Sequence, residues 1–131
     1  MFAAAQPIET AERQVSSAET APLVRTAVLL ARVWELRDAQ MVAILGGMQP
    51  ESWRRWCAGR VEIVDRERLR RMALLRDIHV AIRGETTGVG PADWIRARQS
   101  ALGGRSPLQV MTSGRIDDLI RLRDTFAPLA A

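Results

Sequence analysis

The chain has 131 residues and a mass of 14.6 kDa, which allows one domain or two very small ones. Its single cysteine and single histidine exclude a disulfide framework and a four-cysteine zinc site, and they argue against histidine-based catalysis. All 19 basic residues are arginines and the net charge is +4, so every cation is a planar fork suited to phosphate, guanine or carboxylate. These counts favour a binding protein over an enzyme. The absence of a signal-peptide pattern or a long apolar run predicts a cytoplasmic protein without a membrane span.

The basic excess is concentrated in the middle third of the chain. Between Glu51 and Arg83, nine arginines stand against five acids, a net charge of +4, whereas residues 1–50 carry −1 and residues 84–131 carry +1. A local basic field is the expected footprint of a polyanion site. Two alternatives stay open: codon usage in a GC-rich genome can explain why every cation is an arginine, and the arginines of the middle third can form a solvated helix face on which they pair with Asp65, Glu67 and Asp77.

The first part of the chain predicts a tail followed by a helix. Residues 1–20 are small and polar and are expected to form a flexible tail. A helix is expected to begin at Pro22, with Thr20 available as its cap, and to end near Leu36. The apolar stripe of this helix is Leu23, Ala27, Leu30 and Trp34.

Two short helices are expected next, joined by a glycine turn. Asp38 is predicted to cap the first of them, which Gly46-Gly47 end. Pro50 opens the second, which Gly59 closes. The apolar residues of this pair are Met41, Ile44, Leu45 and Met48 in the first helix and Trp53 and Trp56 in the second.

The rest of the chain also predicts helices. Asp65 is expected to cap a long helix that runs to about Arg83, and residues 84–90, with three glycines, predict a linker. A short helix around Trp94 (91–98), a loop (101–105), a helix that Ser106 caps, and a last helix (115–127) follow. No strand pair, repeat or heptad series is visible, and the pattern predicts an all-α protein.

The helices expected over 38–45 and 50–59 have the proportions of a helix-turn-helix, whose second helix lies in the major groove. A helical hairpin that only packs the core fits the same spacing. In the DNA-binding interpretation, the side chains opposite the two tryptophans would read bases, and an arginine just after the helix would contact phosphate. The predicted DNA-binding residues are Gln49, Ser52, Arg54, Arg55 and Arg60.

Residues 94–108 (WIRARQSALGGRSPL) combine a tryptophan start, an Ala-Leu-Gly-Gly loop and an Arg-Ser-Pro-Leu helix start, followed by a glycine and an apolar last helix. This combination resembles the signature of the Xre/MbcA/ParS antitoxin family. Residues 45–60, with their Arg-Trp-x-x-Gly-Arg ending, are similar to the degenerate Xre-type helix-turn-helix of that family. The resemblance implies a tail (1–20), a helix-turn-helix domain (21–83), a linker (84–90) and a small helical toxin-binding domain (91–131).

The resemblance also implies a function. Such a protein is the antitoxin of a type II toxin–antitoxin system, and it occludes a RES-domain toxin that consumes NAD or transfers ADP-ribose. It acts without a cofactor or metal, is not an enzyme, and as a homodimer represses its own operon by binding operator DNA. The expected toxin-binding residues are Leu102, Gly103, Gly104, Arg105, Arg121 and Leu129. Two alternatives stay open: a solitary helix-turn-helix regulator without a toxin partner, and a purely intramolecular role for Arg105.

Three further features are assigned structural roles. His79 is expected to be a core histidine, and Cys57 a small buried residue. Asp117 and Asp118 are expected in the first turn of the last helix, where carboxylates offset the helix dipole.

Overall fold

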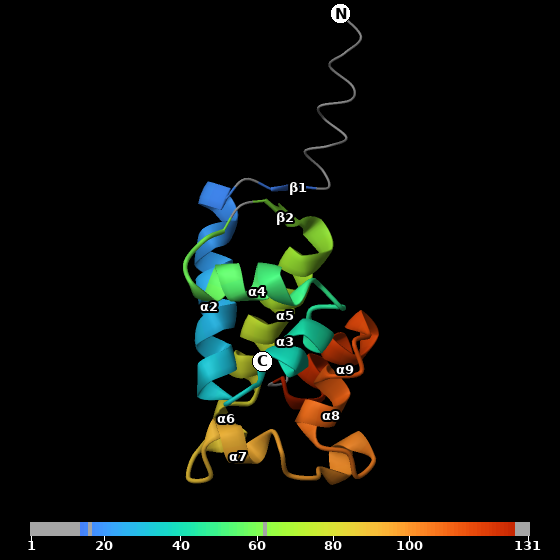
Figure 1. The fold of residues 1–131 in the computed structure, drawn as a ribbon. Helices are drawn as coiled ribbons and strands as arrows, with labels where there is room; N and C mark the ends of the chain where they lie inside the picture. Colours follow the sequence, from blue (N-terminus) through green and yellow to red (C-terminus); the bar gives the residue numbers. More distant parts are fainter. Residues whose placement is uncertain (1–13, 16, 62, 128–131) are drawn as a thin grey trace, which may run out of the picture.

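Helices make up most of the chain in the computed structural model, which describes residues 14–15, 17–61 and 63–127 (Figure 1). The all-α prediction is therefore confirmed for these residues. The elements in chain order are β1 (Gln14–Val15), α2 (Ser17–Val33), α3 (Asp38–Ile44), α4 (Pro50–Cys57), β2 (Val64–Asp65), α5 (Arg66–Ala81), α6 (Arg83–Thr86), α7 (Pro91–Trp94), the 3-10 turn η2 (Ser100–Leu102), α8 (Pro107–Met111) and α9 (Ile116–Phe126).

The first long helix differs from its prediction at both ends. α2 begins at Ser17, so residues 17–20 are helical and the predicted tail is too long. Burial of Thr20 (1% exposed) accounts for this, because it anchors the helix upstream of Pro22. The helix ends at Val33 because Glu35 adopts a left-handed conformation (φ 53°) and the Leu36 N–H donates to the carbonyl of Ala31 (2.8 Å).

A strand pair that the sequence pattern does not reveal joins two distant segments. β1 pairs antiparallel with β2, with Gln14 opposite Asp65 and Val15 opposite Val64. The prediction of no strand pair was wrong, because two-residue strands this far apart carry no local periodicity. The pair holds the start of α2 beside the start of α5 (Figure 1).

The start of α3 is also not as predicted. Asp38 is the first residue of the helix, Arg37 occupies the capping position, and the Arg37 N–H donates to the Gln40 side chain (2.8 Å). The Asp38 carboxylate instead accepts a hydrogen bond from Trp53 of α4 (3.2 Å). The Asp38 carboxylate, which local spacing assigns to the helix cap, therefore forms a tertiary hydrogen bond instead.

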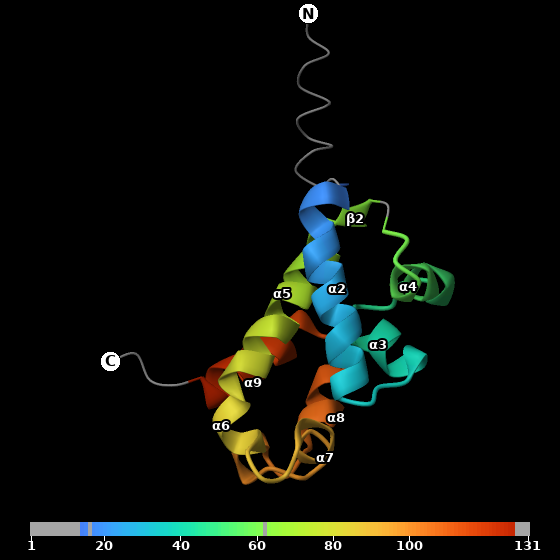
Figure 2. The same ribbon diagram turned by 90° about the vertical axis from the view of Figure 1, so that its left-hand side faces the viewer.

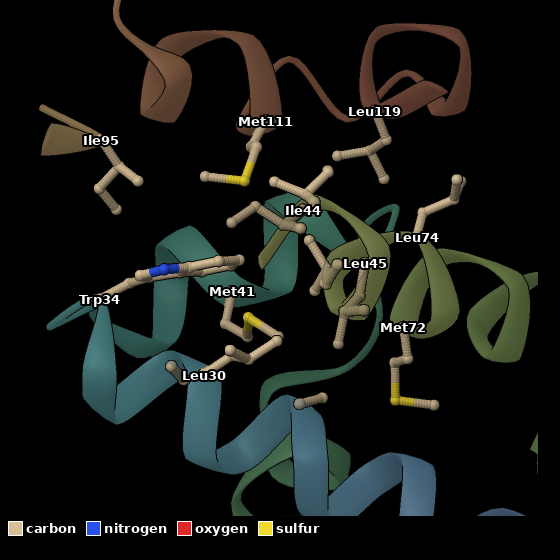
Figure 3. Packing of buried hydrophobic residues seen from close by; sticks show 14 of the residues in the cluster. Leu30, Trp34, Met41, Ile44, Leu45, Met72, Leu74, Ile95, Met111 and Leu119 are labelled. Atoms are coloured by element: carbon tan, nitrogen blue, oxygen red, sulfur yellow. The ribbon is translucent and has the colours of Figure 1, made fainter. Parts of the chain in front are cut away.

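α5 lies at the centre of the fold and contacts α2 on one side and α9 on the other. In Figure 2, α4 lies at the edge of the molecule, on the opposite side of α2 from α9. A single hydrophobic cluster includes residues from before and after the 84–90 segment. Figure 3 shows Trp34, Ile44 and Leu45 meeting Met111 and Leu119 from the C-terminal part of the chain.

The C-terminal elements follow the predicted order with shorter bounds. The predicted linker begins inside α6, where the hydroxyls of Thr86 and Thr87 both donate to the Arg83 carbonyl (3.2 and 3.3 Å). The capping box of α8 is confirmed, since the Gln109 N–H donates to Ser106 Oγ (3.1 Å) and the Ser106 N–H donates to Gln109 Oε1 (2.8 Å). Asp117 and Asp118 lie in the first turn of α9, as predicted.

In the described part of the chain, we find no helix with both the length and the apolar character that a bilayer span requires.

Candidate functional site

α4 is held against the body of the protein by two aromatic side chains. Trp53 (1% exposed) and Trp56 (8% exposed) form the inward face, with their ring centroids 6.4 Å apart in an edge-to-face arrangement. The Trp53 indole N–H donates to Asp38 Oδ1 (3.2 Å), which ties α4 to the first residue of α3. The outward face of α4 is therefore presented on a helix whose orientation is determined by buried contacts.

The two adjacent arginines of α4 have different surroundings. Arg54 lies between two carboxylates, with Nε 3.8 Å from Asp38 Oδ2 and Nη1 3.7 Å from Glu51 Oε1. Arg55 is exposed and donates to Ser52 Oγ (3.1 Å), and no described carboxylate lies within ion-pair distance of it. Arg55 is thus the α4 cation whose charge is available to an external anion.

The other predicted DNA-binding residues lie on or beside this surface. Gln49 and Arg60 are exposed at the two ends of α4, and the Arg60 N–H donates to the carbonyl of Arg55 (2.8 Å). Ser52 is half-buried and orients Arg55. All five predicted residues therefore belong to one short segment, in which the neighbouring acids Asp38 and Glu51 partly neutralise the charge of Arg54.

The arginines of α5 are mostly paired within the chain. Arg68 lies 3.4 Å from Asp65 and 3.6 Å from Glu67, and Arg76 lies 3.5 Å from Asp77. The ion pairs of Arg68 and Arg76 are solvent-exposed to different degrees, and such pairs contribute little to stability. They do reduce the local positive field, so the basic surface of the middle third is smaller than the residue count indicates.

The predicted toxin-binding loop is a closed turn stabilised by backbone hydrogen bonds. The Gln99 N–H donates to the Arg105 carbonyl (3.0 Å), and the Gly104 N–H donates to the Gln99 carbonyl (3.0 Å). Gly103 and Gly104 have φ of 68° and 84°, a left-handed conformation that favours glycine at this turn. The loop therefore exposes backbone that a partner can approach closely.

The side chains of the predicted toxin-binding set do not all face solvent. Leu102 is 5% exposed, so its side chain belongs to the core and supports the loop from below. Arg105 is exposed and donates from Nε to the Leu102 carbonyl (3.4 Å), an intramolecular contact that does not involve its Nη atoms. Arg121 is exposed on α9, in a shallow depression with Ile120. Leu129 lies outside the described residues.

Cys57 is exposed, which corrects its assignment as a buried residue. Trp53 and Trp56 define the inward face of α4, and the next position turns roughly 100° away from it, since a helix has 3.6 residues per turn. Partial burial and the Asp38 carboxylate raise the pKa of the Cys57 thiol, against an opposing effect of Arg32.

His79 is half-buried, with its ring centroid 6.4 Å from that of Trp34. Desolvation, and secondarily the charge of Arg83, lower the pKa of His79 below its ordinary value. Among the described residues, no three histidine, cysteine or acidic side chains gather where they could hold a metal ion.

Two arginines have structural roles that the sequence pattern does not predict. Arg71, on α5, is buried (6% exposed) and bonds to carbonyls of two other segments. Arg96 donates to the carbonyls of Trp34 (2.8 Å) and Glu35 (2.7 Å), and so satisfies the end of α2. Their long side chains reach segments distant in sequence, and no local pattern signals such contacts.

No protein-family model matches the chain, and no curated protein or solved structure matches it either.

Proposed function

We propose that this protein is an antitoxin-type regulator that binds operator DNA through α4 and a RES-domain toxin through its C-terminal loop and last helix. DNA binding is supported chiefly by the exposed guanidinium of Arg55, which forms no ion pair with a described carboxylate. Arg55 lies on a helix that the Trp53–Asp38 hydrogen bond holds in place. The toxin half rests on the resemblance of residues 94–108 to the Xre/MbcA/ParS antitoxins.

In the DNA complex, α4 lies in the major groove with its outward face against base edges. Arg55 donates bidentately to guanine O6 and N7, while Gln49 at the start of the helix pairs with adenine. Arg60 contacts a phosphate after the end of the helix. Two copies of the chain would present two such helices to the half-sites of an operator.

In the toxin complex, the exposed turn at Gly103 and Gly104 approaches the partner closely, and Arg105 supplies a forked cation for a carboxylate or an anion-binding region. Arg121 adds a second cation from α9. The protein acts stoichiometrically by covering the toxin's active site, and it needs no cofactor for this.

The DNA half is tested by comparing Arg55→Ala with Arg54→Ala. Both substitutions remove one positive charge, so they share the loss of non-specific attraction to phosphate. Binding to a duplex from upstream of the protein's own gene is measured by fluorescence anisotropy. We expect Arg55→Ala to cost about 1–3 kcal/mol beyond the Arg54→Ala loss, as for removal of a base-reading arginine. Equal losses in the two variants would refute the assignment of Arg55.

The toxin half is tested by co-expression with a RES-domain protein encoded beside this gene. We expect the wild-type protein to form a stable complex and to restore growth, and we expect Arg105→Ala to weaken both while leaving DNA binding intact. Arg98→Ala is the control, because Arg98 is an exposed arginine just before the same loop. DNA binding without any toxin complex would instead identify a solitary transcriptional regulator.

A further inference from the structure

One buried arginine connects the turn before α4 with the turn before α9. Arg71, in the middle of α5, donates from Nη1 to the carbonyl of Ile44 (3.2 Å) and to the carbonyl of Gly114 (2.9 Å). Its Nη2 donates to Glu67 Oε1 (3.4 Å). Ile44 is the last residue of α3, and Gly114 lies between α8 and α9. A single nitrogen atom therefore bonds to both segments.

The backbone approaches closely at the same place. A Cβ atom on Gly46 would lie 3.0 Å from the Arg71 guanidinium, and one on Gly114 would lie 3.3 Å from the carbonyl oxygen of Ala43. Both glycines have left-handed φ values, 88° and 79°. Gly46 therefore lies against the Arg71 guanidinium and Gly114 lies against the last turn of α3, so a side chain at either position would require its neighbour to move.

The energetics of Arg71 make the two contacts interdependent. A buried cation is costly unless it is well paired, and Glu67, the carboxylate beside it, is 55% exposed. The carbonyl of Ile44 at the C-terminal end of α3 and the carbonyl of Gly114 in the turn before α9 accept hydrogen bonds that help to compensate the guanidinium. Because the Nε atom of Arg71 is buried without a partner, loss of either carbonyl would leave the cation still less satisfied.

We propose that Arg71 is a positioning residue that couples the turn at 112–115 to the turn at 45–49, so that displacement of α9 shifts α4. The coupling itself is a property of the fold. Its consequence, that a partner bound to the C-terminal part changes the affinity of α4 for DNA, rests on the proposed function.

Hydrogen exchange on the full chain tests the coupling. In Arg71→Lys the ammonium keeps the charge, but the lysine side chain is one bond shorter and does not place its nitrogen at the Nη1 position that bonds to both carbonyls. We expect the amides of Gly46 and Gly47 and those of Thr112 and Ser113 to lose protection together, by about tenfold or more, as expected for loss of hydrogen bonds to a charged group. Glu67→Gln is the control, because it removes the ion pair and leaves the hydrogen bonds from Arg71 to both carbonyls. In this variant the protection of the same amides should stay within about twofold of wild type. Loss of protection in one turn alone, or an equal effect in Glu67→Gln, would overturn the proposal.

Gly114→Ala provides a second test with Arg71 intact, and it applies even if Arg71→Lys fails to fold. The new methyl group requires a shift away from the Ala43 carbonyl and a strained φ. We expect the amides of Gly46 and Gly47 to exchange about tenfold faster although the substitution is in the other turn. Unchanged exchange there would contradict the coupling.

DNA affinity separates this inference from the proposed function. If wild type binds operator DNA, Arg71→Lys and Gly114→Ala should each weaken binding at least about fivefold. Circular dichroism should show that the helix content of both variants equals that of wild type. If wild type does not bind DNA while the two turns still lose protection together, the proposed function fails and the coupling stands. If wild type binds DNA but the two turns do not lose protection together, only the role of Arg71 is refuted.

Discussion

The attachment of α4 to the rest of the protein can be measured by replacing Trp53 with phenylalanine. The substitution removes the indole N–H that donates to Asp38 and leaves the edge-to-face contact with the Trp56 ring available. Loss of roughly three buried ring atoms costs about 2 kcal/mol. Loss of the hydrogen bond adds about 1 kcal/mol, less than is usual for a charged acceptor, because Asp38 is 56% exposed and water replaces the indole.

Trp56→Phe is the matched control, since it makes the same ring change on the same face of α4. Trp56 is 8% exposed, and its indole N–H has no hydrogen-bond partner among the described residues. Urea unfolding followed by far-ultraviolet circular dichroism gives the free energy of unfolding of each variant. We expect Trp53→Phe to be destabilised by about 1 kcal/mol more than Trp56→Phe. An equal or larger loss in Trp56→Phe would refute the anchoring role of the Trp53–Asp38 bond.

Two further predictions concern the local structure of the chain. Ser106→Ala removes the side chain that accepts the Gln109 N–H, and urea unfolding should show a loss of about 1 kcal/mol; no loss would mean that the capping box is not stabilising. The pKa of His79 is lowered on folding, so its contribution to stability is fully present above the ordinary value of 6.5 and is lost as the pH falls through 6.5 toward the folded pKa. Between about pH 7.5 and 5.5, the urea midpoint should therefore fall more for wild type than for His79→Gln, and parallel pH profiles would contradict the assignment.

Features determined by neighbouring residues could be predicted from the sequence. The capping box joins Ser106 to Gln109, three residues later, and the inward face of α4 follows from the spacing of Trp53 and Trp56. Helix periodicity and capping depend on contacts within one or two turns, so the residue order alone contains them. The outward position of Arg54 and Arg55 follows from the same spacing.

The different surroundings of those two arginines required the tertiary structure. Asp38 is sixteen positions before Arg54, and its carboxylate serves α4 instead of capping its own helix. Arg55, with an identical side chain and an adjacent position, has no such partner among the described residues. The sequence likewise predicts that Leu102 lies in a loop, whereas in the structure its side chain is buried in the core.

Residue order is sufficient to predict that the protein is helical, where most helices begin, and which face of each helix is apolar, because these depend on short-range periodicity and capping. Which arginines carry external charge and which hold the fold together follows from tertiary contacts. Arg71 bonds to the carbonyls of Ile44 and Gly114, 27 and 43 residues away, and its guanidinium lies against Gly46. Such contacts depend on how whole helices cross, and no local pattern in the chain encodes that crossing.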